Sequence, residues 1–392
     1  MTYLLKTEST SAVDPATVAG NNVIPFYTWN DTGNALLKRR NATNTDWEII
    51  CPLLPNASFQ NDGSNYDIIV GGSNVGSFTP DGIRADNIKG QNLLINGNFR
   101  IWQRASSSTI NGYGSNDRWL DIHGGTTKTV SRELFTLGQT DVPDNPVFYS
   151  RTVIGTPSGT PANDIVIKQQ RVEGVNTASG KTVALSFWAK SDQSLDIGVS
   201  FFQSFGAGGS PSAPVYLIDP QIFTLSPNWE KYSGTFSIPS VSGKVLGTSG
   251  TDSLGLIFSL CTGSTYNNNY TPVGNQTGTI DLAQVKLEIS SVPTPWVEPS
   301  LHAQLFDCMR YYEQGTFVYV WYNAIGSGTG NMQPYAARKR ASPTLTWTSV
   351  TNSNVTNPGL ATTGIEGIQE TGSLTAAGTG QHAGTYYANA EI

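Results

Sequence analysis

Charged side chains are scarce in this sequence of 392 residues, since Asp, Glu, Lys and Arg together make up 13% of it. The formal net charge is −6, so the chain lacks the basic excess that nucleic-acid-binding proteins use to contact phosphates. Two short basic runs exist, Lys38–Arg40 and Arg338–Arg340, and we interpret both as solvated charges on strands or loops. The sequence therefore predicts no nucleic-acid partner.

Cysteine is rare, with 3 residues in the whole chain: Cys51, Cys261 and Cys308. They are far apart and odd in number, which argues against a disulfide framework. None of them belongs to a metal-ligand motif such as Cys-x-x-Cys. We expect the thiols to be reduced, as in proteins that assemble in a reducing compartment.

Catalytic motifs are also missing. His123, His302 and His382 are the 3 histidines, and none lies in a recognisable nucleophile motif. Glycoside hydrolysis needs two suitably spaced carboxylates, but we interpret the candidates Asp117 and Asp281 as structural, because one precedes Arg-Trp and the other lies in a strand. No Gly-rich loop has the strand–loop–helix context of a phosphate site. The sequence predicts a protein that is not an enzyme.

Long apolar runs are absent as well. No run approaches the ~18 residues that indicate a membrane-spanning helix, so we expect no membrane insertion. The first residues, Met1–Lys6, are followed by polar residues and not by the apolar core of a signal peptide. No internal repeat stands out, which argues against a β-helix or a propeller.

What the chain does contain is a series of short alternating apolar segments separated by clusters of turn-forming residues. This pattern predicts a mostly β protein whose main domain, residues 91–299, is an antiparallel jelly-roll β-sandwich. The strands expected within it are 165–172, 183–189, 195–201, 232–238 and 254–260.

The chain before residue 91 divides in two. Residues 1–55 are predicted to be a small β module, with strands at 23–30, 35–41 and 45–50 and a hairpin turn at Asp31–Asn34. Residues 56–90 have short apolar segments among Gly, Asp and Asn, too sparse to form a core in a single chain. They are either a shaft in which three chains wind together or a flexible linker.

Residues 300–392 are expected to form one connecting helix and a C-terminal β domain. Leu301, Leu305, Cys308 and Tyr312 have helical spacing, and we expect this stripe to pack against the sandwich or a neighbouring subunit. Prolines at 293, 295 and 299 separate this region from the sandwich. The strands expected after the helix are 316–322, 344–350 and 384–392.

The most specific stretch is Asn92–Arg104, followed by Asn116–Trp119. Its Asn-Leu-Leu-Ile-Asn-Gly-Asn-Phe sequence predicts a strand that runs into a turn with a positive φ at Gly97. We expect this strand and Thr279–Glu288 to be the first and last strands of the sandwich.

These motifs resemble a jelly-roll module found in bacteriophage tail fibre and receptor-binding proteins, which is distantly similar to carbohydrate-binding jelly rolls. The resemblance runs in order through residues 91–313. It rests on Asn92–Phe99, Ile101–Arg104, Asp117–Trp119, Leu185–Lys190, Trp229–Tyr232, Thr235–Pro239, Asp281–Glu288, Thr294–Glu298 and Cys308–Tyr312.

The resemblance implies a virion protein assembled in the cytoplasm of a bacterial host. Residues 1–55 resemble adaptor modules that attach tail proteins to the particle, and residues 336–344 resemble the C-terminal domain of such fibres. The implied partners are two further copies in a homotrimer, other tail or adaptor proteins and a host cell-surface polysaccharide. The alternatives are a non-adhesive decoration or connector protein, a polysaccharide-degrading enzyme, and a bacterial carbohydrate-binding protein.

Sugar binding uses flat aromatic faces together with Asn, Asp and Gln side chains. Phe99, Trp102, Trp119, Phe187 and Trp188 fall within the matched framework, where we expect them to pack in the core. Loops carry function more often than the scaffold does, so we place the glycan site in polar loops and in the distal domain. The predicted glycan-binding residues are Tyr266, Asn268, Tyr270, Trp321, Tyr322 and Tyr386.

Similar carbohydrate-binding jelly rolls often carry a structural calcium near the first and last strands, held by oxygen ligands. By position, the resemblance places these ligands at Asn98 and Asp281. Arg100, however, occupies a position that is commonly acidic, and a cationic side chain beside calcium is unfavourable. We therefore expect no cofactor.

Overall fold

The computed structural model describes residues 91–323 and 326–392, together with the backbone of eight strands within residues 1–90. The side chains of residues 321–331 lie outside the described part. The chain divides into two compact units, residues 1–89 and 90–392, and each is described by itself. Among the helices of the described residues, none is long and apolar enough to cross a bilayer.

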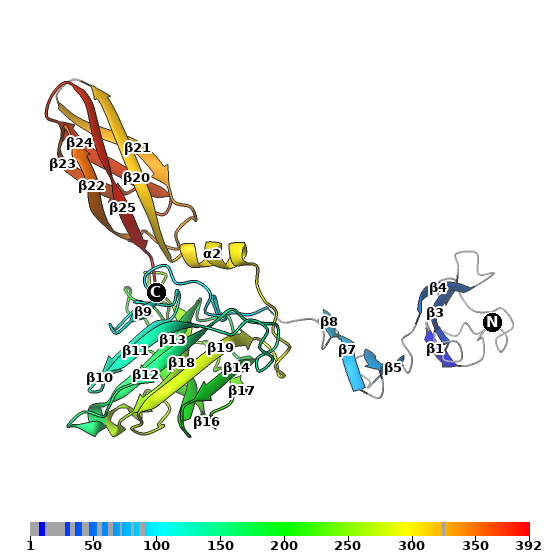
Figure 1. Ribbon diagram of the computed structural model, residues 1–392. Coiled ribbons are helices and arrows are strands. Elements are labelled where there is room, and N and C mark those ends of the chain that lie inside the picture. The colour runs from blue at the N-terminus through cyan, green and yellow to red at the C-terminus, as the bar shows by residue number, and fades with distance from the viewer. Residues whose placement is uncertain are drawn as a thin grey trace. The chain divides into compact units, whose positions relative to one another are not determined.

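The first unit contains two four-stranded sheets (Figure 1). The strands of the first sheet are β1 Glu8–Ser11, β2 Thr28–Asp31, β3 Leu36–Arg40 and β4 Trp47–Pro52, and they lie in this order. Strand β1 is parallel to β2, and the other neighbouring strands are antiparallel. The other is an antiparallel meander of β5 Ala57–Asn61, β6 Tyr66–Val70, β7 Ser73–Thr79 and β8 Gly82–Ala85. The sequence prediction of a shaft or linker for residues 56–90 did not include this second sheet.

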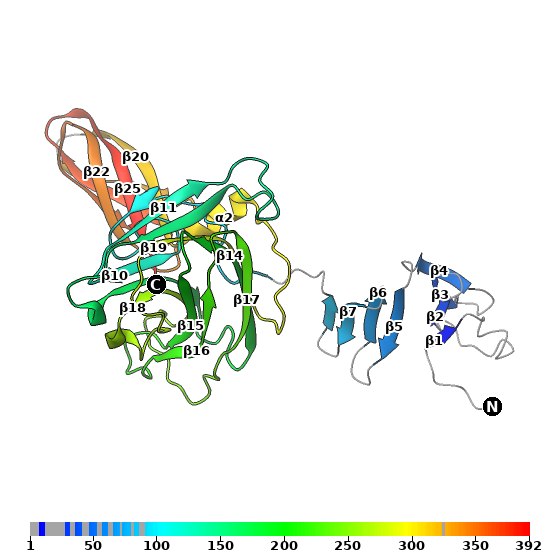
Figure 2. The ribbon, with the colours of Figure 1, turned by 60° about the horizontal axis from the view of Figure 1, so that its bottom comes forward.

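The second unit begins with a two-layer antiparallel sandwich (Figures 1 and 2). The five-stranded layer has the order β10 Leu120–Gly124, β13 Ile165–Glu173, β18 Ser253–Thr262, β15 Asp196–Ser204 and β16 Val215–Thr224. The six-stranded layer has the order β17 Glu230–Ser237, β14 Thr182–Ser191, β19 Gly278–Glu288, β12 Phe148–Ile154, β11 Lys128–Leu134 and β9 Ser107–Ser108. Two short 3₁₀ helices, η1 Pro161–Asn163 and η2 Ser264–Tyr266, lie in the connections.

The core lies between these layers because alternate residues of each strand point inward. Phe187 of β14 meets Phe258 of β18 with ring centroids 5.2 Å apart, and Phe201 of β15 meets Phe236 of β17 at 5.1 Å. All four rings are fully buried. Each such ring contributes about 1.5–3 kcal/mol relative to an exposed position, so these contacts hold the two sheets together.

The mostly β sandwich predicted from the sequence is confirmed. The five strands expected within residues 91–299, and the last strand at 279–288, correspond to β13, β14, β15, β17, β18 and β19. Strands β10, β11, β12 and β16 were not predicted. Their sequences are less regular, and β16 carries a positive φ at Leu217 and Asp219 that interrupts simple alternation.

Residues 92–104 run beside β19 but do not form a regular strand. Leu93 N donates to Leu287 O at 2.8 Å, and Val285 N donates to Gly97 O at 2.8 Å. The predicted positive φ at Gly97 is wrong: the positive values are at Asn96 (59°) and Phe99 (52°). Asn tolerates this conformation because its short polar side chain bonds locally.

Asn96 illustrates that local bonding. Its side-chain oxygen accepts from Ile101 N at 2.9 Å, and its amide donates to Ile101 O and Asp117 O. Trp119 Nε1 donates to the Asn96 carbonyl at 3.0 Å. The motif that carries the family resemblance thus joins residues 96–101 to residues 117–119 as a buried structural unit.

Gly97 is required for space. A Cβ at this position would lie 2.1 Å from the Val285 carbonyl oxygen. We expect Gly97→Ala to force these backbones apart and lower the free energy of unfolding by about 1–3 kcal/mol, as overpacking does elsewhere. Gly159→Ala is the matched control, because a Cβ there meets nothing within 4 Å. Thermal unfolding of the two variants measures the difference, and equal midpoints would contradict the close approach.

The connecting helix, α2 Leu301–Met309, is shorter than the predicted stripe. Ser300 caps its start, with Oγ accepting from Ala303 N at 3.2 Å. Cys308 and Gln304 form its buried face, whereas Leu301 is 46% exposed. Gln304 Nε2 donates to Asn98 Oδ1 at 2.6 Å, so a hydrogen bond links the helix to the 92–104 segment.

A second, smaller β-sandwich follows α2 (Figure 1). Its strands form two three-stranded sheets, one of β20 Tyr312–Asn323, β25 Gly378–Asn389 and β22 Thr344–Ser353, the other of β21 Gly326–Pro334, β24 Gly367–Leu374 and β23 Val355–Thr362. Phe317 and Tyr386 from the first sheet pack with Leu360 and Ile368 from the second. Strands β21, β23 and β24, rich in Gly and Thr, were not predicted.

The interpretation of Arg338–Arg340 as solvated charges is wrong for two of its residues. Lys339 is buried, and its Nζ lies 2.5 Å from Glu313 Oε2. Arg340 is nearly buried and donates to Ala390 O at 3.0 Å, while Arg338 is exposed, as expected. The sequence could not indicate that Lys339 is buried, because its partner Glu313 is 26 residues away and comes near only in the folded chain.

The two sandwiches of the second unit meet around the end of the chain. Glu391 lies between Arg118, with which it forms a buried ion pair, and Arg104, whose Nη2 is 3.3 Å away. The Arg118 guanidinium lies 3.4 Å from the Tyr311 ring centroid, and Arg104 lies 3.6 Å from that of Tyr312. Arg104 and Arg118, which belong to the motifs that carry the family resemblance, therefore bind Glu391.

Candidate functional site

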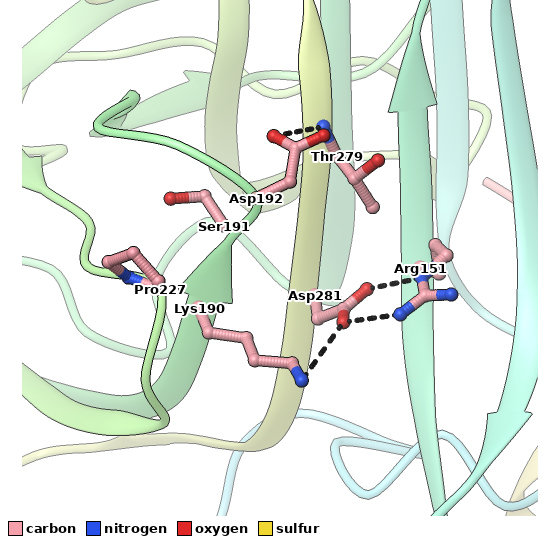
Figure 3. A pocket seen from close by; sticks show the side chains of 7 residues that line it. All are labelled: Arg151, Lys190, Ser191, Asp192, Pro227, Thr279 and Asp281. Atoms are coloured by element: carbon pink, nitrogen blue, oxygen red, sulfur yellow. Dashed lines mark hydrogen bonds and ion pairs between the residues drawn. The ribbon is translucent and has the colours of Figure 1, made fainter.

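A cleft of about 330 Å³ opens on the outer face of the six-stranded sheet (Figure 3). Ile280 and Leu282 of β19 point into the core, so Asp281 between them points outward. The strand register places Arg151 of β12 and Lys190 of β14 directly opposite Asp281 on either side. The lining residues are Arg151, Lys190, Ser191, Asp192, Pro227, Thr279 and Asp281.

The charges in this cleft hold one another in place. Arg151 binds Asp281 with two hydrogen bonds, Nε to Oδ1 at 2.8 Å and Nη2 to Oδ2 at 2.9 Å. Lys190 Nζ lies 3.9 Å from Asp281 Oδ2. The hydrogen bonds that Arg151 donates to Asp281 raise the pKa of Arg151 above its usual value, so this side chain stays cationic. A fixed fork of this kind preorganises its remaining N–H donors.

Accessibility differs within the cluster. Asp281 is 3% exposed, whereas Arg151 and Lys190 are 33% and 30% exposed. At the other end of the cleft, exposed Asp192 accepts a hydrogen bond from Thr279 N at 3.0 Å through one carboxylate oxygen (Figure 3). A ligand in the cleft therefore meets donors from Arg151 and Lys190 and a carboxylate from Asp192.

Three half-buried aromatic rings stand beside these polar groups. Trp229 lies 5.3 Å from Tyr149 and 5.1 Å from Phe135, measured between ring centroids. Lys190 Nζ is 5.2 Å from the Trp229 centroid, and Arg151 Nη2 is 3.3 Å from Tyr149 Oη. Burial, followed by the charge of Asp281, raises the pKa of Tyr149, which keeps its hydroxyl protonated. The polar lining of the cleft thus has a cluster of aromatic rings next to it, in contact with Lys190 and Arg151.

The predicted loop site lies on the opposite face of the sandwich. Tyr266 and Tyr270 contact each other with ring centroids 6.2 Å apart and pack against Ile165, Ile167, Phe202 and Ile257, on the outer face of the five-stranded sheet. Both rings are half-buried, and Asn268 between them is exposed. The loop covers an apolar sheet surface, so part of each ring is used in packing.

The other predicted aromatic residues belong to the C-terminal sandwich. Tyr386 is buried in its core, and its hydroxyl donates to Glu313 Oε1 at 2.5 Å, so the ring presents no open face. Trp321 and Tyr322 lie in β20, but their side chains fall outside the described residues. The structure does not bring Tyr386 together with Tyr266 and Tyr270, which belong to the first sandwich.

Asn98 and Asp281, the calcium candidates, have different partners. Asn98 Nδ2 donates to Glu298 Oε1 at 2.6 Å, and its Oδ1 accepts from Gln304. Both Asp281 oxygens face cationic side chains, so neither residue offers free oxygens to a metal. Nor does any group of three or more His, Cys, Asp and Glu side chains among the described residues suit a metal ion. These residues do not fit a calcium site.

Sequence reasoning missed most of the cleft. It named Asp281 as a structural carboxylate and as a metal candidate, and it quoted Lys190 and Trp229 only as residues of the framework motifs. One signal was present: Asp281 stands between the apolar residues Ile280 and Leu282 in a strand of the core, and a buried carboxylate is normally paired with a cation. The identity of those cations depends on strand register, which pairs residues 130 positions apart.

Comparison with known proteins gives matches among solved structures alone: no protein-family model and no curated protein matches the chain. A CBM4 structure is 17% identical, covering 50% of this chain and 98% of its own, with a TM-score of 0.29. TmCBM61 in complex with β-1,4-galactotriose is 9% identical, covering 51% and 99%, with a TM-score of 0.28. The enzymatically active domain of bacteriophage CBA120 tailspike protein 4 is 12% identical, covering 51% of this chain and 21% of its own, with a TM-score of 0.31. At these values the matches assign no function.

Proposed function

We propose that this protein is a bacteriophage tail fibre protein that binds a host-surface glycan in the cleft above β12, β14 and β19. The observation that carries the proposal is a cleft lined by two accessible cations and a carboxylate, Arg151, Lys190 and Asp192. Two aromatic side chains contact these cations: Trp229 lies beside Lys190, and Tyr149 lies beside Arg151. Sugars present apolar ring faces and many hydroxyls, and this combination of groups matches both.

The electrostatics of the cleft favour hydroxyl recognition over binding of a free anion. Asp281 already neutralises much of the positive charge of Arg151 and Lys190, and Asp192 adds a further negative charge at the rim. Arg151 and Lys190 are held by the ion pairs with Asp281, and Asp192 is held by its hydrogen bond from Thr279 N. These side chains can therefore bind sugar hydroxyl groups with little further loss of conformational entropy. The ligand we expect is therefore a neutral sugar residue or a sugar with few charged substituents.

The role in a fibre rests on the sequence resemblance of residues 91–313 and of residues 1–55. In this proposal the N-terminal module attaches the protein to the particle, and three copies form the fibre. One shallow cleft per chain gives weak binding, but several cleft–glycan contacts made at once multiply the apparent affinity. The opposing candidate is a connector protein of the virion, which binds no glycan.

Variants of the cleft test the proposal. We expect Lys190→Ala and Trp229→Ala each to weaken glycan binding about five- to tenfold, the equivalent of one hydrogen bond or one ring contact of ~1–1.4 kcal/mol. Lys231→Ala is the matched control, because Lys231 is exposed on the adjacent strand β17, opposite Trp188. Isothermal titration with the glycan that binds the wild type measures all three.

Two further variants distinguish binding in the cleft from binding at the loop. Asp192→Ala provides a second exposed cleft variant if Trp229→Ala unfolds, and Tyr270→Ala tests the loop on the opposite face. Loss of binding in Tyr270→Ala with unchanged affinity in the cleft variants would move the site to the loop. Failure of the wild type to bind any bacterial surface glycan would favour the connector role.

A further inference from the structure

A serine, a histidine and a glutamate form a hydrogen-bonded chain in the C-terminal sandwich. Ser349 Oγ lies 2.9 Å from His382 Nε2, and His382 Nδ1 lies 2.5 Å from Glu370 Oε1. Each ring nitrogen of the imidazole thus has one partner, a hydroxyl on one side and a carboxyl group on the other. Serine acyl-transfer enzymes use this order of groups, in which the imidazole takes the hydroxyl proton and the acid orients the imidazole.

The three residues come from three strands and differ in exposure. Ser349 lies on β22 and is exposed, whereas His382 of β25 and Glu370 of the opposing sheet are fully buried. The Phe317 ring packs edge-on against the imidazole, with centroids 4.9 Å apart. A reagent can therefore reach the hydroxyl, while the imidazole behind it is held in one orientation.

A purely structural role explains this arrangement less well. Glu370 Oε2 is buried and has no hydrogen-bond partner among the described residues. Leaving a buried polar atom unpaired costs about 1–3 kcal/mol, and an apolar pair of the same shape would avoid that cost. Sites that break a local packing rule in this way are often functional.

The backbone around Ser349 supplies a candidate oxyanion donor. Strand β22 is one edge of its sheet and, among the described strands, pairs with β25 alone, so alternate N–H groups of β22 face away from the sheet. The register shifts between Ser349 and Thr351, which makes Val350 the extra residue of a β-bulge. Such a residue is unpaired in the ladder, which makes the N–H of Val350 a candidate donor to an oxyanion formed at Ser349.

We propose that Ser349 is the nucleophile of an ester-hydrolysing site, with His382 as its general base and Glu370 as the positioning residue. Ser349 Oγ attacks the ester carbonyl carbon while its proton passes to His382 Nε2. The bond to the leaving alkoxide breaks, and His382 returns the proton to that oxygen. His382 then deprotonates a water molecule, whose oxygen attacks the acyl-serine carbonyl carbon. The bond from that carbon to Oγ breaks, and His382 returns the proton to Oγ, which releases a carboxylic acid and restores the Ser349 hydroxyl.

The exposed edge strand indicates the class of substrate. An ester that reacts at Ser349 approaches an open surface, so the site admits an ester carried on a larger molecule, such as an acylated hydroxyl group of a polysaccharide. This activity goes beyond glycan binding in the cleft, because it uses different residues in a different sandwich.

The protonation of the pair sets the expected pH dependence. Burial raises the pKa of Glu370 to about 8 and lowers the pKa of His382. Tyr319 of β20 also faces Glu370, and burial together with that carboxyl raises the pKa of Tyr319 to about 12, so Tyr319 stays neutral. Below pH 8, protonated Glu370 donates to Nδ1 and leaves the proton of the imidazole on Nε2. Above pH 8, the carboxylate accepts from Nδ1, and Nε2 is free to act as a base.

Fluorophosphonate labelling and hydrolysis of p-nitrophenyl acetate by the full chain test the proposal. At pH 9 we expect Ser349 to be labelled and the wild type to hydrolyse the ester at least tenfold faster than Ser349→Ala. Ser353→Ala, an exposed serine on the same strand, should behave like the wild type. Glu370→Gln should abolish the rise in rate near pH 8, a change that a merely structural residue would not cause. Equal rates in the wild type and Ser349→Ala, or no label on Ser349, would overturn the proposal.

Discussion

Replacing Lys339 with methionine is expected to lower the free energy of unfolding of the C-terminal sandwich by about 3 kcal/mol, because breaking a buried ion pair leaves the other charge without its counterion. Lys339 Nζ lies 2.5 Å from Glu313 Oε2 and donates to Met309 O at 2.6 Å, and both side chains of the ion pair are buried. Burial lowers the pKa of Lys339, and the hydrogen bond and charge of Glu313 oppose that shift. Glu313 keeps hydrogen bonds from Tyr386 and Ala336, so we expect the lower end of the usual range.

The neighbouring arginine provides a matched control. Arg338 pairs with Glu366 at 3.0 Å, but both side chains are more than half exposed. Exposed pairs contribute about 0–1 kcal/mol, so Arg338→Ala should have little effect. Differential scanning calorimetry of both variants measures the contrast. The double variant Glu313→Gln/Lys339→Met should recover part of the loss, and equal effects of Arg338→Ala and Lys339→Met would contradict the buried pair.

Replacing Glu391 with alanine is expected to lower the free energy of unfolding by about 3–5 kcal/mol, because this change also leaves a buried charge without its counterion. Arg118 and Glu391 are almost fully buried, and Arg104 also pairs with Glu391. The variant leaves the Arg118 guanidinium buried beside Tyr311 without a counterion. It also loosens the end of the chain, where Tyr113 Oη donates to Ile392 O at 3.2 Å.

Unfolding and proteolysis together measure this second effect. We expect the Glu391→Ala protein to unfold at a lower temperature and its C-terminal residues to be cleaved faster by carboxypeptidase. Glu366→Ala is the control, because Glu366 forms an exposed pair in the same sandwich. A Glu391→Ala protein that matches this control in both assays would show that the ion pairs of Arg118 and Arg104 do not hold the two sandwiches together.

The sequence predicted the sandwich because its strands alternate strongly. In β19, for example, buried Ile280, Leu282, Val285 and Leu287 form much of the inner face. It did not predict β16 or the second sheet of the C-terminal sandwich, whose strands contain bulges, Gly and Thr in place of alternating apolar residues. The turn at residues 96–99 was recognised, but its positive φ values fall on Asn96 and Phe99, since Gly97 serves close packing against β19.

The sites could not be predicted for a related reason. Arg151, Lys190 and Asp281 meet because three strands adopt one register. Ser349 and His382 meet across the β22–β25 pair, and Glu370 reaches His382 from the other sheet of the sandwich. Neither set has a characteristic spacing along the chain. The aromatic loop at Tyr266 and Tyr270 was visible in the sequence, but the apolar sheet that it covers was not.

Hydrogen–deuterium exchange of the full chain, with and without its best-binding glycan, tests the central claim most directly. The proposal predicts slower exchange at the cleft, in residues 188–192 and 227–229, with little change in the loop at 264–270. Protection confined to 264–270, or no protection anywhere in residues 91–299 at saturating glycan, would contradict binding in the cleft.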